Sequence, residues 1–437
     1  MSTRRARSLA LQPRTENLES RRLLAATFRG TDIDGDIFTL RLAGTGDLRV
    51  ERVKADGVTP ETDPSQPALI SKITVAGTDP TASRLIGRVT KGAGGDGKVF
   101  FDSMVGYGGL GAGTPGALGI QTIDMPGFYL GATTATPATP GGPVASINLP
   151  DGVNTLRFGG VDTTYTRPGA TPLNQNNTND QFTIQLGLPL QLGTTVVVDK
   201  IVTSGQAAQP TTTGQPGQPT QDGVTFNVTG RINTFQANSI EGNADLPTSG
   251  FEGGGGTIVA SIPDKNNTIT GQIGFVKVGG NATNFSTQTN DKVSNFYIGG
   301  ETDNVFLLAP GGSRDLYFGK GLDNTTIRSH YIGSLQTNRG AIQSEVFVDR
   351  NIGRLSFGGD VINTHVISGV EQGLLGVLQN QQAPTNVNVQ NGGSIQQILI
   401  AGDVTNSVFV ASVDPGPDGV YGTLPELARP HGSIVSD

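Results

Sequence analysis

A short pattern recurs along the second half of the chain with a period of about 20 residues. An apolar residue is followed by two variable positions, a second apolar residue, one variable position, a third slot that is usually apolar, and then Gly, Ala or Asn. The third slot falls at Val278, Ile298, Phe318, Thr337, Phe357 and Ile400. The steps are 20, 20, 19, 20 and 43 residues, and the last step is interpreted as two periods with a short insertion. Repetition at this period predicts a solenoid.

A second marker keeps the same phase, because an asparagine lies five or six residues after the first glycine-slot residue of most copies. These residues are Asn284, Asn304, Asn324, Asn363 and Asn406. Asparagine tolerates left-handed backbone and can stack with its equivalents as an amide ladder. Glycine after the third slot supplies a corner that a β-carbon would obstruct.

The fold class expected from these periods is all-β, specifically a parallel β-helix with coils of about 20 residues and long irregular loop insertions. The apolar runs are short, β-branched or aromatic, and interrupted by Gly and Asn, which favours strands over helices. A leucine-rich-repeat horseshoe is the competing solenoid, but it requires several leucines and a helical return in each repeat. Neither is found in these periods.

Looser copies upstream suggest that the repeat begins early, with third slots at Val75, Met125, Phe158 and Ala237. The 79 residues from Val153 to Ile232 are interpreted as about four coils, and the 41 residues from Ile232 to Ile273 as about two. Residues 36–53 alternate with period 2 and predict a β-hairpin or an N-terminal cap.

Four regions follow from these patterns. Residues 1–30 form a basic targeting segment, 31–145 an N-terminal β cap with irregular coils, 146–412 the repeats, and 413–437 a C-terminal tail. Within the repeats, 204–223 and 372–393 are rich in polar residues, Pro or Gly, and are expected to be flexible loops.

Composition excludes several functional classes. The chain has 437 residues with no Cys, no Trp and a net charge of -7. Without cysteine there is no disulfide framework, zinc ribbon, iron–sulfur cluster or thiol nucleophile. Net acidity argues against nucleic acid as a partner. No apolar run approaches the length of a transmembrane helix, so no transmembrane segment is expected.

The N-terminal segment is the exception to this acidity. It contains seven arginines within the first 30 residues but no apolar core of a secretory signal. The run Leu18-Glu19-Ser20-Arg21-Arg22-Leu23-Leu24 resembles the LEPR-XLL motif of large planctomycete surface and secreted proteins. Leu18, Glu19, Arg21, Leu23 and Leu24 match that motif, and Ser20 replaces its proline. The resemblance implies an extracellular or cell-surface location and says nothing about activity.

One candidate metal site lies just after this segment. Asp32, Asp34 and Asp36 alternate in the run Asp32-Ile33-Asp34-Gly35-Asp36, and carboxylates are preferred ligands of Ca²⁺. The EF-hand spacing fails, because Arg41 stands where its glutamate belongs. A turn between two strands is the main interpretation, and a partial Ca²⁺ site is the alternative. No other cofactor is expected.

Function is therefore expected to be non-enzymatic: an exported structural β-helix protein of the envelope, matrix or adhesion. Extracellular polysaccharide or other envelope proteins are the candidate partners, and the oligomeric state is left open. The alternative is a β-helix that binds or cleaves polysaccharide. The paired carboxylates and Gly-His-Gly signature of pectin hydrolases are not found, and the three histidines, His330, His365 and His431, occupy unrelated slots.

Overall fold

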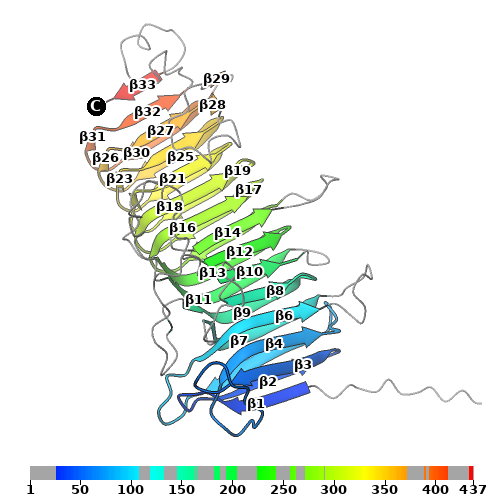
Figure 1. The fold of residues 1–437 in the computed structure, drawn as a ribbon. Coiled ribbons are helices and arrows are strands. Elements are labelled where there is room, and N and C mark those ends of the chain that lie inside the picture. The colour runs from blue at the N-terminus through cyan, green and yellow to red at the C-terminus, as the bar shows by residue number, and fades with distance from the viewer. Residues whose placement is uncertain are drawn as a thin grey trace, which may run out of the picture.

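The computed structural model describes residues 26–107, 119–131, 145–162, 165, 182–187, 193–203, 224–242, 256–261, 271–289, 291–371, 388–389, 393–411 and 433–436. All regular structure in these residues is β-strand, and most strands join one long, largely parallel sheet that forms an elongated stack (Figure 1). Over the same ranges, no helix is long and apolar enough to cross a membrane. The all-β prediction is confirmed, and the parallel sheet is compatible with a solenoid.

Two ladders of parallel strands run through the molecule. The first ladder contains β4 (Leu69–Ala76), β6 (Val99–Tyr107), β8 (Ala145–Leu149), β10 (Phe182–Leu186), β12 (Val224–Thr229), β14 (Gly256–Ser261), β16 (Ala282–Thr289), β18 (Thr302–Ala309), β21 (Thr326–Ser329), β24 (Glu345–Val348), β27 (His365–Ser368) and β32 (Val408–Ala411). The second ladder contains β5 (Arg84–Thr90), β7 (Ile120–Leu130), β9 (Val153–Asp162), β11 (Thr194–Val202), β13 (Ile232–Glu241), β15 (Ile273–Val278), β17 (Lys292–Ile298), β19 (Gly312–Phe318), β22 (Ile332–Thr337), β25 (Asn351–Phe357) and β30 (Ser394–Ile400).

A third ladder of short pairings lies between them in the chain order. It runs from the ends of β7, β9, β11 and β13 to the starts of β16 and β18. It continues as β20 (Leu322–Asp323), β23 (Ala341–Ile342), β26 (Val361–Ile362) and β31 (Val404–Thr405). One passage of the chain through the second, third and first ladders is called a rung below. Two further strands, β28 (Val370–Glu371) and β29 (Asn388–Val389), pair antiparallel with each other.

The register confirms the phase of the repeat. Val278 pairs with Ile298, and the pairing continues through Phe318, Thr337 and Phe357 to Ile400. The prediction for the last step is wrong, because Phe357 pairs directly with Ile400 and the extra residues are one insertion between neighbouring rungs.

Two upstream expectations also need correction. β11 (Thr194–Val202) pairs with both β9 and β13, so Val153 and Ile232 are two rungs apart rather than four. Ile232 pairs directly with Ile273, one rung on rather than two. The copy ending at Val75 lies in β4 of the first ladder, not in the second. The insertions are therefore longer, and the rungs fewer, than the spacing suggested.

The three apolar slots of each repeat face one continuous core. Phe296, Phe318 and Phe357 are at most 1% exposed, and the aromatic rings of Phe296 and Phe318 lie 5.7 Å apart. Because burying a large apolar side chain is worth roughly 1.5–3 kcal/mol, the columns formed by these slots are a main source of stability.

The asparagine slot has the left-handed backbone that the sequence predicts. Asn284, Asn304, Asn324, Asn363 and Asn406 have φ between 46° and 52°. Gln343, with φ 49°, fills the same slot in the rung where the sequence shows no asparagine. The Asn304 Nδ2 donates to Asn284 Oδ1 at 2.6 Å, which is one link of the expected amide ladder.

The glycines between the second and third ladders allow neighbouring rungs to approach closely. A β-carbon on Gly299 would lie 2.4 Å from the Gly279 carbonyl oxygen, and one on Gly319 would lie 2.3 Å from the Gly299 carbonyl oxygen. At Gly299 and Gly319 this corner, called the glycine corner below, requires glycine for space rather than for an unusual φ.

The long insertions avoid the glycine corner from β7 onward. Four insertions follow the third-ladder strand and precede the first-ladder strand of the same rung, one insertion in each of four successive rungs. They are residues 132–144, 163–181, 204–223 and 243–255. Residues 188–192, 262–270 and 372–387 lie between the first and second ladders. The predicted loops at 204–223 and 372–393 thus fall almost wholly outside the described residues.

The N-terminal end has the expected cap. β1 (Ala26–Thr31) pairs antiparallel with β2 (Ile37–Ala43), and β2 pairs antiparallel with β5. β3 (Asp47–Val53) pairs antiparallel with β4 instead of with β2, so residues 36–53 form cap strands on two ladders rather than a hairpin. β1 begins inside the predicted basic segment because residues 26–31 complete this sheet.

The C-terminal end is closed on one ladder only, within the described residues. β33 (Ser433–Ser436) pairs antiparallel with β32, so part of the predicted tail belongs to the sheet.

Candidate functional site

The clearest cluster of ionisable side chains lies at the N-terminal end, where the β1–β2 turn meets residues 91–98. The Asp32 amide donates to the Asp36 carbonyl at 2.7 Å, and Gly35 has φ 97°. Residues 32–36 are therefore the tight turn between two strands that the sequence predicts as the main interpretation.

Asp36 holds the loop 91–98 against this turn. Its side chain is fully buried, and its two carboxylate oxygens accept hydrogen bonds from the Gly92 amide at 2.7 Å and the Gly97 amide at 2.6 Å. A β-carbon on Gly95 would lie 1.7 Å from Asp36 Oδ1, so the loop needs glycine to wrap around the carboxylate. Hydrogen bonds of this charge-assisted kind are the stronger ones in proteins.

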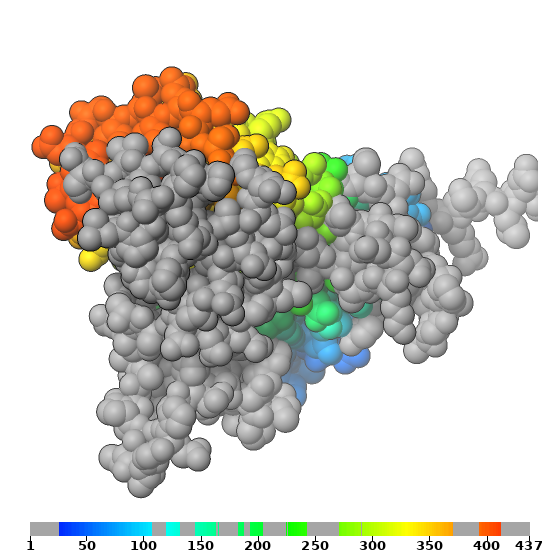
Figure 2. Space-filling view, turned by 90° about the horizontal axis from the view of Figure 1, so that it is seen from above, coloured from blue at the N-terminus to red at the C-terminus, as the bar shows by residue number. Residues whose placement is uncertain are grey.

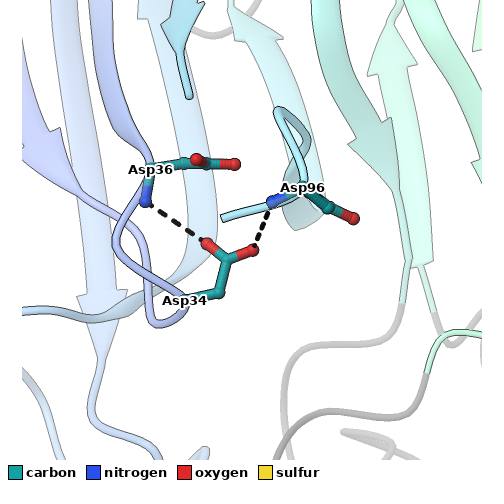
Figure 3. Close-up of side chains that lie close together, drawn as sticks. All are labelled: Asp34, Asp36 and Asp96. Carbon is teal, nitrogen blue, oxygen red and sulfur yellow. Dashed lines mark hydrogen bonds between the residues drawn. The ribbon is translucent and has the colours of Figure 1, made fainter. Parts of the chain in front are cut away.

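Asp34 bridges the turn and the loop, as Figure 3 shows. Its Oδ1 accepts from the Asp36 amide at 3.3 Å, and its Oδ2 accepts from the Asp96 amide at 3.2 Å. Asp34, Asp36 and Asp96 each offer a carboxylate oxygen, and these oxygens all lie within 4.8 Å of one another. Three carboxylates at this spacing suit a hard cation such as Ca²⁺.

The third member of this group differs from the predicted one. The structure brings Asp34 and Asp36 together with Asp96, and Asp32 is outside the group. Asp96 was missed because it lies 60 residues along the chain from Asp36, in a Gly-rich segment without strand pattern. No local spacing links the two positions, so only the pairing of β2 with β5, which precedes the loop, connects them.

Asp32 has a different environment. Its side chain is 3% exposed, and its Oδ1 accepts from the Ile33 amide at 2.5 Å. Burial, with smaller contributions from Asp34, Asp36 and Asp96 and against the hydrogen bond from the Ile33 amide, raises the pKa of this carboxyl to about 7. Asp32 can therefore exchange a proton near neutral pH.

Aromatic side chains border the carboxylates. The Phe100 ring stacks on Tyr165 with centroids 3.7 Å apart and contacts Tyr129 at 5.8 Å. Burial, followed by Asp32, Asp34, Asp96 and Asp102, raises the pKa of Tyr165 above its ordinary value. Burial and then Asp199 raise the pKa of Tyr129 to about 12. Both phenols therefore stay protonated at neutral pH.

Two further polar contacts complete this neighbourhood. The Tyr129 hydroxyl donates to Asp199 Oδ2 at 3.4 Å, and Lys98 Nζ lies 5.0 Å from the centre of the Tyr129 ring. The residues Asp34, Asp36, Asp96, Lys98, Phe100, Tyr129 and Tyr165 are called the acidic–aromatic cluster below. Aromatic faces beside hydroxyl and carboxylate groups suit a sugar as well as a cation.

The other residues singled out in the sequence lie elsewhere. His330 Nδ1 lies 3.2 Å from Asp349 Oδ2, and His365 is exposed on β27, so neither contacts the acidic–aromatic cluster. His431 and the targeting residues Leu18, Glu19, Arg21, Leu23 and Leu24 fall outside the described residues.

Comparison of this chain with family models, with curated proteins and with solved structures gives no match in any of the three. The function proposed below therefore rests on the residues of the chain itself.

Proposed function

We propose that the chain is a parallel β-helix that acts as a non-enzymatic, exported structural protein of the cell envelope, matrix or adhesion. The observation that carries this proposal is the continuous parallel pairing of the second ladder, strand after strand, from β5 to β30. A chain that stacks one apolar column over so many rungs gains a stiff, elongated shape, and shape is what a scaffold supplies.

Contacts between neighbouring rungs support the same role. On the outside of the second ladder, Arg88 and Arg157 lie 2.9 Å and 3.7 Å from the two oxygens of Asp124. Further along, the rings of Tyr297 and Tyr317 stack with centroids 5.0 Å apart and planes 7° apart. Side-chain contacts of this kind between neighbouring rungs add resistance to bending and local unfolding.

The exported location rests on the resemblance of residues 18–24 to the LEPR-XLL motif and on the arginines around them. Fractionation of the native host, with immunodetection of the chain, tests this part. We expect the protein in the envelope or culture medium, and recovery in the cytosol would contradict the proposed location.

A second candidate function is binding of an extracellular polysaccharide at the acidic–aromatic cluster. The observation that favours it is the meeting of Phe100, Tyr129 and Tyr165 with a group of carboxylates. Screening the purified protein against neutral and acidic glycans, with Ca²⁺ and with chelator, separates the candidates. Retention without turnover would support binding, whereas release of shorter glycans would overturn the non-enzymatic proposal.

A further inference from the structure

The last strand of the second ladder is built like an interior strand but lies at an end. The core slots of β30 are Ile395, Ile398 and Ile400, and all three are partly exposed. The equivalent slots of its neighbour β25 are at most 1% exposed. Leu399, on the opposite face of β30, is 41% exposed. Figure 2 looks down on this end, with residues 393–411 in orange.

The backbone of β30 has a paired strand on one side only in the part of the chain that the structure describes. Among the described residues, β30 pairs with β25 alone, while β32 in the same rung is covered by β33. Among the described strands, the first ladder is therefore one strand taller than the second at this end, which leaves a step one strand deep between them. The N-terminal end differs, because β1 and β3 both run as antiparallel cap strands there.

The strands β30 and β33 themselves lack the residues that usually protect an exposed strand edge. Native sheets guard free edges with charged residues or proline. β30 reads Ser-Ile-Gln-Gln-Ile-Leu-Ile and β33 reads Ser-Ile-Val-Ser, so neither contains a charged residue or proline. Neutral edges with apolar residues can pair with a second strand without charge repulsion.

The step is complementary to itself. A two-fold axis perpendicular to the stack, through the corner between the first and second ladders, places the first ladder of one copy over the second ladder of the other. The raised β33 of each copy then lies in the step above β30 of the other copy. Such an isologous contact uses the same surface twice and closes as a dimer.

We propose that two copies of this chain associate through their C-terminal ends as a closed two-fold dimer, with β33 of each copy adding to β30 of the other. The partly exposed column of Ile395, Ile398 and Ile400 becomes covered on both copies. The contact also removes both free edges, which limits assembly to two copies rather than a filament.

The test is the oligomeric state of the full-length chain by analytical ultracentrifugation over a wide range of concentrations. The disrupting variant is Gln397→Lys with Leu399→Lys, since both side chains are exposed on the end strand. The matched control is Ser334→Lys with Gln336→Lys, which places the same charges in the same columns two strands inward.

We expect the wild type and the control to be dimers, and the disrupting variant to dissociate at concentrations about tenfold higher or more, because lysine on an edge strand opposes the addition of another strand. Deleting residues 433–437, which removes β33, should dissociate the dimer as well, with the far-ultraviolet circular dichroism of the sheet retained. This deletion decides the matter if the lysine variant fails to fold.

Three results would overturn the proposal. A wild type that stays monomeric at every concentration means that another segment of the chain, or an unrelated partner, covers this end. A dimer that survives both the lysine substitutions and the deletion uses another surface. If the control dissociates as much as the disrupting variant, the added charge weakens the dimer wherever it is placed, and the end strand has no special role.

Discussion

At the residue scale, one slot in each repeat holds a left-handed residue. Asparagine fills it in five rungs and Gln343 in a sixth. The sequence identified this slot from the asparagines alone, because few other residues tolerate positive φ. Gln343 could not be found that way, since glutamine has no comparable preference and only the register places it in line with its neighbours.

Substitution of Asn304 separates the backbone from the side-chain contribution. Asn304→Ala should lower the free energy of unfolding by about 1–2 kcal/mol, because alanine is strained at positive φ and the bond to Asn284 is lost. Asn304→Gly loses the bond but relieves the backbone, so its loss should be smaller. Urea denaturation followed by circular dichroism measures both, and equal losses would contradict the role of the backbone.

Asp32 predicts a pH dependence of stability. Its pKa is about 7 in the folded chain and near 3.8 when unfolded, so the folded state binds more protons between these values. Stability from this group is therefore present at low pH and is lost as pH rises through this window, by up to about 1.4 kcal/mol per pH unit. Asp32→Asn should remove this slope.

The measurement is urea unfolding of wild type and Asp32→Asn in chelator from pH 4 to pH 8. Because other groups titrate in this range, the useful quantity is the difference between the two proteins. A difference that stays constant with pH would show that Asp32 has an ordinary pKa in the folded chain.

At the element scale, the glycine corner makes a prediction with an internal control. The same slot of three successive rungs is occupied by Gly279, Gly299 and Gly319. A β-carbon on Gly279 would lie 3.6 Å from its nearest neighbour, the Asn238 carbonyl oxygen, which is an ordinary contact distance. Gly319→Ala should lower stability by about 1–3 kcal/mol through overpacking, and Gly279→Ala should be nearly neutral. Ala401 already fills this slot in the last rung. Thermal unfolding that ranks the two variants equally would contradict the geometry.

The turn and loop that meet at the acidic–aromatic cluster predict an effect of calcium. If Asp34, Asp36 and Asp96 hold Ca²⁺, the ion should raise the thermal midpoint of unfolding, and Asp34→Asn should reduce that rise. Asp79→Asn, at an exposed turn outside the cluster, is the control. A midpoint that is the same in Ca²⁺ and in chelator would exclude the metal site.

The pairing of strands could be predicted from the sequence where the repeat pattern is spaced evenly along the chain. The slots from Val278 to Phe357 follow one another at nearly constant spacing, so pattern alone gives their pairing. β11 was missed because Thr194 starts it and Asp199-Lys200 replace its glycines. Asp96 was missed for a different reason, since its contact with Asp34 depends on tertiary structure that a sequence pattern does not contain.

At the scale of the whole molecule, the rungs should be independent of the long insertions. β11 and β12 flank residues 204–223, yet each pairs with strands from other rungs. Replacing these residues with a short Gly- and Asn-containing linker should change the thermal midpoint little, because loop-closure entropy depends weakly on length. Loss of the sheet signal in circular dichroism would show that the insertion is needed for folding.

The placement of the insertions has a consequence for what the molecule can present to its surroundings. Asp162, Val202 and Glu241 pair in register at the points where three successive insertions leave the sheet. Neighbouring attachment points are therefore separated by only about 4.8 Å along one ridge. Short sequences carried at these positions would form a dense row, so a single chain could offer the same epitope several times and gain avidity without oligomerising.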